Sequence, residues 1–241
     1  MSSPVVQVVL ISAIPVGAAF LGALAAALHP PGPMVRSSIQ HFAAGVIFSV
    51  VAVELLPEVR RVHDPFEVGW TFAAGVVLML GIEEAAKRFA PAVEHGAARG
   101  PSAGQLVPIG VDLLLDGLLI GIAMTAGLKQ GILLTVALTL ELFSLGLAMA
   151  LTFGSATMPV RILAPTAIAC LMVVGAVLGR VFLADASVHV LAGLLSFGCA
   201  ALLFLVTEEL LIEAHESADN ALTTAMFFAG FLTFLLLGMV E

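Results

Sequence analysis

The segment VDLLLDGLLIG, residues 111–121, decides the fold class, because it carries two carboxylates inside an apolar run long enough to cross a bilayer. Asp112 and Asp116 are four residues apart, so on a helix they share one face. An acidic side chain deep in a membrane span costs about 2.5–3.5 kcal/mol, so it normally faces a partner or water. Since residues 106–126 contain no Lys or Arg, the two acids indicate a site for a cation.

The composition is that of an integral membrane protein. Of the 241 residues, 61% are hydrophobic and 11% are charged, whereas soluble domains carry about 25% charged residues. Acidic residues outnumber basic ones by 17 to 9, which gives a net charge of -8. This excess of negative charge argues against nucleic acid as a partner and favours a cation.

Eight stretches are apolar and long enough for a membrane helix, which needs about 20 residues. They are residues 5–28, 39–59, 68–89, 106–126, 131–153, 162–183, 188–211 and 222–240. The first has no basic leading segment and is longer than a signal-peptide core, so we expect it to be retained. We therefore predict an all-α integral membrane protein with eight transmembrane helices, in one domain over residues 1–241 and without a convincing internal repeat.

The connections between the spans are short. Three prolines in HPPGPMVR, residues 29–36, separate the first two spans. The longest polar stretch, about residues 90–105, is rich in Gly, Ala, Pro and Ser and predicts a flexible linker after the third span. With the N-terminus outside, basic residues divide five to four between inner and outer loops, so charge alone does not decide the orientation.

Acidic residues also lie in other spans. Glu141 is close to the middle of residues 131–153, as Asp116 is close to the middle of residues 106–126, so we expect both at the same depth. Glu54 lies in the second span, and Glu209 directly follows the apolar run of the seventh.

The end of the third span has a simpler interpretation. Glu83 and Glu84 precede Lys87 and Arg88 by four residues each. Pairs of opposite charge at this spacing are typical of a helix end, so we expect ion pairs rather than a binding site here.

Small residues predict which spans approach closely. Gly117, Gly121 and Gly146 lie in the fourth and fifth spans, and glycines let two membrane helices come close together. We expect these glycines to bring those two spans into contact.

Three carboxylates at mid-depth would repel one another if all were ionised. A divalent ion relieves that repulsion and so does protonation, so metal binding would compete with protons. The acids could instead form a proton relay or a neutral, hydrogen-bonded structural cluster. An enzyme is not expected, because the sequence contains neither HExxH nor GxSxG.

Three motifs are similar, in order and spacing, to the second, fourth and seventh helices of one known family. They are HFAAGVIFSVVAVELLPE at residues 41–58, DLLLDGLLIG at residues 112–121 and TEELLIEAH at residues 207–215. The family is the ZIP family of divalent metal transporters (zinc- and iron-regulated transporter-like proteins). The resemblance implies eight transmembrane helices in a 3+5 arrangement, with the linker after helix three and both termini outside.

The resemblance also implies a metal site. Asp112 stands where the family has a metal-binding His, Asp116 where it has Asp or Glu, and Glu141 at the acid of the fifth helix. Ser144 and Met172 stand where the family has glutamates. The full set of implied metal ligands is Asp112, Asp116, Glu141, Glu54, Ser144, Met172 and Glu209.

These replacements favour one bound ion over a two-metal centre. Oxygen donors favour Mn, Mg, Ca or Fe(II), although zinc also binds carboxylates. The resemblance implies transport of zinc, iron or manganese toward the cytoplasm, by a multi-pass protein of a bacterial inner membrane.

The expected partners follow from this interpretation. They are the divalent cation, as transported substrate rather than prosthetic cofactor, and the lipid bilayer, with a homodimer as an open alternative. Two other functions stay open: a ZIP-fold homologue whose acids form a structural or sensory cluster, and a proton-coupled carrier of an organic solute.

Overall fold

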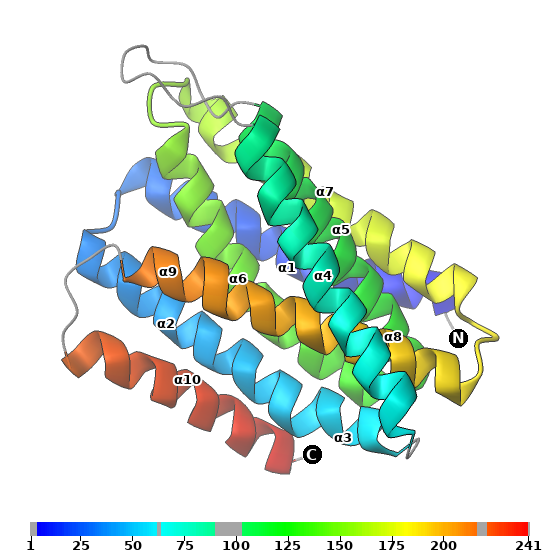
Figure 1. Ribbon diagram of the computed structural model, residues 1–241. Helices are drawn as coiled ribbons and strands as arrows, with labels where there is room; N and C mark the ends of the chain where they lie inside the picture. Colours follow the sequence, from blue (N-terminus) through cyan, green and yellow to red (C-terminus); the bar gives the residue numbers. More distant parts are fainter. Residues whose placement is uncertain (1–3, 62–63, 90–102, 216–220, 241) are drawn as a thin grey trace.

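The computed structural model describes residues 4–61, 64–89, 103–215 and 221–240, and within these residues the chain is helical without strands (Figure 1). The elements are α1 (Pro4–Leu28), α2 (Pro33–Val50), η1 (Val51–Leu55), α3 (Leu56–Arg60), α4 (Pro65–Phe89), α5 (Ala103–Ala126), α6 (Leu128–Thr152), α7 (Met158–Phe182), α8 (Val188–Leu205), η2 (Val206–Leu210), α9 (Leu211–Ala214) and α10 (Ala221–Val240). The predicted linker lies outside the described residues up to position 102, and α5 begins at Ala103.

Among the residues that the structure describes, eight helices are long and apolar enough to cross a membrane, as in a multi-pass membrane protein. This confirms the predicted class and number of spans. The second span, Pro33–Arg60, combines α2, η1 and α3 into one continuous rod, and the seventh, Val188–Leu210, combines α8 and η2.

The ends of the helices follow from local sequence. The proline-rich segment ends α1 at Leu28 and starts α2 at Pro33, where the missing proline N–H costs no helical hydrogen bond. Asp64 caps α4, because its Oδ1 accepts hydrogen bonds from the backbone N–H of Phe66 and Glu67, each at 3.1 Å.

The expected ion pairs at the end of α4 are present. Lys87 contacts Glu83, and Arg88 Nε lies 2.9 Å from Glu84 Oε1. The Glu83 side chain raises the pKa of Lys87, first through their hydrogen bond and then through its charge. These exposed pairs decorate the end of the helix, as predicted.

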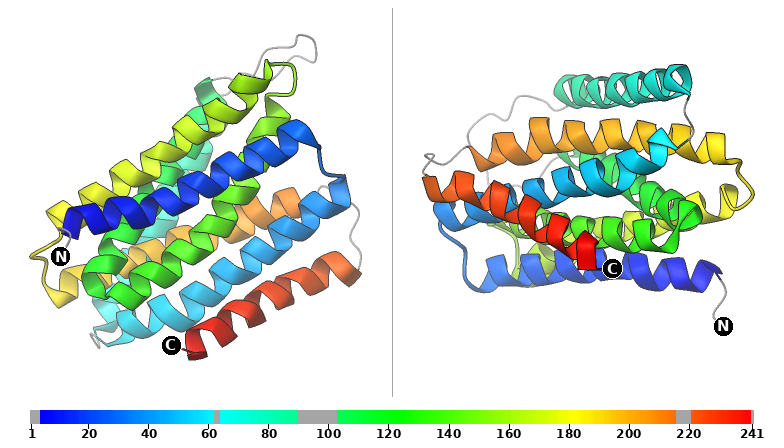
Figure 2. Two further views of the ribbon diagram at one scale, coloured as in Figure 1. Left: turned by 180° about the vertical axis from the view of Figure 1, so that it is seen from behind. Right: turned by 90° about the horizontal axis from the view of Figure 1, so that it is seen from below.

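Helix α6 lies at the centre of the bundle and has the largest fraction of buried residues among the spans, whereas α4 and α10 lie on the periphery (Figure 2). Large apolar side chains of α5 and α6, among them Ile120, Leu134 and Leu138, are fully buried in the main core. The two helices that carry Asp112, Asp116 and Glu141 therefore both contribute to the main core.

The prediction for the glycines was wrong about their partners. A Cβ on Gly117 of α5 would lie 2.0 Å from the backbone oxygen of Met172 on α7. A Cβ on Gly146 of α6 would lie 2.1 Å from the backbone oxygen of Ala19 on α1. These glycines thus bring α5 against α7 and α6 against α1.

Candidate metal centre

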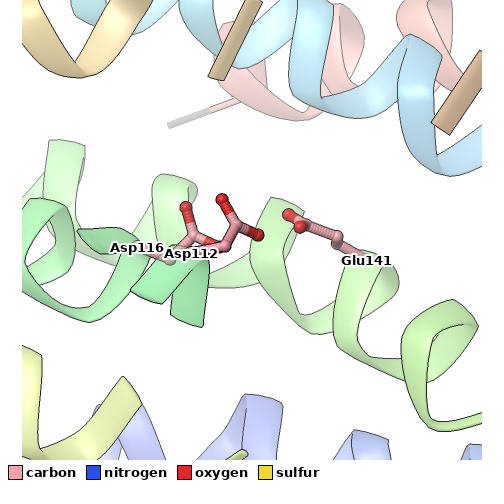
Figure 3. A group of neighbouring side chains, drawn as sticks. All are labelled: Asp112, Asp116 and Glu141. Carbon is pink, nitrogen blue, oxygen red and sulfur yellow. The ribbon is translucent and has the colours of Figure 1, made fainter. Parts of the chain in front are cut away.

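Three carboxylates from two neighbouring spans meet inside the bundle. Asp112 and Asp116 lie one turn apart on α5, and Glu141 lies on α6. One carboxylate oxygen from each lies within 4.8 Å of those of the other two. Figure 3 shows the Glu141 side chain reaching across toward the two aspartates. The structure thus brings together the three acids that the sequence placed at mid-depth.

The inner part of this cluster is shielded from solvent. Asp116 is 2% exposed and Glu141 is 4% exposed, whereas Asp112 is half-buried. Among the described residues, neither Asp116 Oδ2 nor Glu141 Oε2 has a hydrogen-bond partner. Because buried polar atoms are nearly always satisfied, these two oxygens require a partner such as a cation, a proton or a water molecule.

A cavity of about 200 Å³ adjoins the cluster at Asp112. Its acidic lining consists of Glu83 at the end of α4, Asp112, and Glu208 and Glu209 of η2. Glu208 and Glu209 are exposed, so the cavity joins the half-buried Asp112 to the surface between α4, α5 and η2. A cation could therefore approach the buried pair past Glu208 and Glu209, which have the opposite charge, whereas Glu83 is already paired with Lys87.

Glu209 lies beside the centre. It lines the same cavity as Asp112, although its carboxylate is not among the three that lie within 4.8 Å of one another. It lies in η2, a π-helical turn, and such turns often mark functional sites. The position suits an acid that a cation passes on its way to or from the cluster.

Glu54 lies elsewhere. It is in the π-helical turn η1, and its Oε1 would be 3.1 Å from a Cβ on Gly238, so it lies against α10. The next acid of this span, Glu58, is held by Arg61 Nη1 at 3.0 Å and by Gln130 Nε2 at 2.9 Å. The structure therefore does not bring Glu54 into the group of three carboxylates.

Two further predicted ligands are buried near the cluster without belonging to its three acids. Ser144 lies three residues after Glu141 on α6 and is 3% exposed. Met172 of α7 is fully buried in the hydrophobic core, and its backbone oxygen faces Gly117, which follows Asp116. Packing accounts for the position of Met172.

The two π-helical turns were not predicted. They begin the segments VAVELLPE at residues 51–58 and VTEELLIE at residues 206–213, which share the pattern V-x-x-E-L-L-x-E. This shared pattern is the one sequence feature that links the two π-helical turns. It places Glu54 and Glu209 at the same position in their turns.

Two comparisons of this chain with known proteins found no match. No protein-family model matches it, and no curated protein matches it.

Proposed function

We propose that this protein transports a divalent metal cation across the membrane, toward the cytoplasm, through the site of Asp112, Asp116 and Glu141. The observation that carries the proposal is the approach of three carboxylate oxygens to within 4.8 Å inside the bundle. Oxygens bound to one ion at about 2.0–2.6 Å lie at most about 4–5 Å apart. The spacing therefore suits one ion that all three acids share.

The donor set supports a hard or borderline cation. All three groups are carboxylates and none is an imidazole or thiolate, which favours Mn(II), Fe(II), Mg or Ca over a site built for zinc. Zinc binds carboxylates as well, so it belongs among the cations to test. The resemblance to the ZIP family, with its 3+5 arrangement and inner-membrane location, is part of this proposal.

The test is uptake by the purified protein in liposomes, measured for Mn, Fe(II), Zn, Mg and Ca at two pH values. We expect saturable uptake of at least one of these ions, weaker at the lower pH because protons compete for the carboxylates. Protein-free liposomes are the control. Uptake equal to that of the control for every ion would contradict the proposal.

The second candidate is a structural cluster in which the three acids are protonated and neutral. The unpartnered oxygens of Asp116 and Glu141 favour this candidate as much as metal binding, because a proton can take the place of the ion. Thermal unfolding separates the two candidates. A metal that binds only the folded protein stabilises it, by about 2.7 kcal/mol at a concentration of 100 times Kd. We expect millimolar Mn or Fe(II) to raise the Tm of the wild type and not of Glu141→Gln. Equal shifts in both proteins would place the bound ion elsewhere.

A further inference from the structure

Two histidines far apart in the sequence meet between the middle of α2 and the residue that follows α9. The ring centroids of His41 on α2 and His215, which follows α9, lie 5.0 Å apart at an interplanar angle of 57°. His41 is 3% exposed, whereas His215 is exposed, so the pair connects the interior to the surface. Neither ring belongs to the carboxylate group.

Hydrogen bonds favour the same tautomer in both rings. Nδ1 of His41 lies 2.9 Å from the backbone oxygen and 3.3 Å from the hydroxyl oxygen of Ser37, and Nδ1 of His215 contacts the backbone oxygen of Leu211. A carbonyl only accepts, so Nδ1 donates in each ring, and in the neutral ring Nε2 then carries the lone pair. Metal-binding histidines are held in this way, with one nitrogen donating to a carbonyl or carboxylate and the other facing the ion.

The distance between the rings also suits one shared ion. A metal bound to Nε2 at about 2.0–2.1 Å lies about 3.2 Å from the ring centroid, so two rings at a tetrahedral angle have centroids about 5 Å apart. The observed 5.0 Å matches this value. The neighbouring Gln40 is 1% exposed, and neither polar atom of its amide has a hydrogen-bond partner among the described residues.

We propose that His41 and His215 form a binding site for a borderline transition-metal ion such as Zn(II), Ni(II), Co(II) or Cu(II), distinct from the carboxylate centre. Imidazole nitrogens select these metals, whereas Mn, Mg and Ca prefer oxygen. Because α2 and α9 are in contact, the ion would join the two segments and hold them together. The proposal does not depend on transport through the carboxylates.

The experiment uses the full-length protein carrying Asp116→Asn and Glu141→Gln, which removes most of the carboxylate centre. One equivalent of Cu(II) is added and nitrogen hyperfine coupling is measured by electron paramagnetic resonance, with Ni(II) affinity from calorimetry. We expect coupling to two imidazoles and no comparable binding of Mn or Ca. His41→Gln and His215→Ala should each lower the Ni(II) affinity by at least about 10-fold. This is the lower end of the 10–100-fold loss that follows when even an indirect partner of a metal is removed.

Matched controls are His29→Ala and His189→Ala, both exposed histidines, which should bind Ni(II) as the parent does. His215→Ala changes an exposed side chain, so it tests the site even if His41→Gln fails to fold. Unchanged Ni(II) affinity in His215→Ala, or the absence of nitrogen coupling in the parent, would overturn the proposal. Failure of liposome uptake by the wild type would leave these results unaffected.

Discussion

Glu141→Gln is expected to abolish metal uptake while leaving the protein folded. The substitution keeps the shape of the side chain but removes the one negative charge that α6 contributes to the three-carboxylate group. Disturbing even an indirect partner of a metal costs 10–100-fold in affinity or activity, so the loss of a direct ligand should lower uptake at least about 10-fold. Asp116→Asn should behave in the same way, since Asp116 is equally buried.

Both variants should fold at least as stably as the wild type. Lost uptake without a lower Tm would show that the two acids bind the ion rather than stabilise the packing. An ionised carboxylate buried without a hydrogen bond costs free energy, so its replacement by an amide should leave the Tm equal or higher in the absence of metal. Glu67→Gln is the control, because Glu67 lies in the first turn of α4, outside the three-carboxylate group, and pairs with His189 at 3.2 Å. Wild-type uptake by Glu141→Gln and Asp116→Asn would mean that the ion binds elsewhere.

Gly117→Ala is expected to be among the most destabilising single substitutions in this chain. The added Cβ would lie 2.0 Å from the backbone oxygen and 2.7 Å from the backbone carbon of Met172, and backbone atoms cannot rotate away as a side chain does. The helices α5 and α7 must separate, so the cost should reach or exceed the 1–3 kcal/mol of ordinary overpacking. Because Asp116 precedes this glycine, uptake should fall as well.

Thermal unfolding in detergent measures the effect, with Gly17→Ala as control. Gly17 also lies inside a membrane helix, but a Cβ there meets no atom within 4 Å. Alanine is the better helix former by about 1 kcal/mol, so the control should be neutral or more stable. A Tm for Gly117→Ala within the error of the wild type would contradict the close packing of α5 on α7.

The class of the protein and the depth of its acids are properties of the local sequence. Hydropathy over about 20 residues predicts a span, and the 3.6-residue period places Asp112 and Asp116 on one face. The proline-rich segment before Pro33 and the charge pairs beginning at Glu83 are equally local, and the structure has both as predicted. No knowledge of neighbouring helices is needed for any of these conclusions.

The neighbours of each helix were decided by the tertiary structure alone. In a membrane every span is apolar, so hydropathy does not distinguish the face of α5 that meets α7 from the face that meets α6. Steric fit makes that distinction: Gly117 admits the backbone of α7, and the acids of α5 are left facing Glu141. The same non-local packing directs Glu54 toward α10 and joins His41 to His215 across most of the chain.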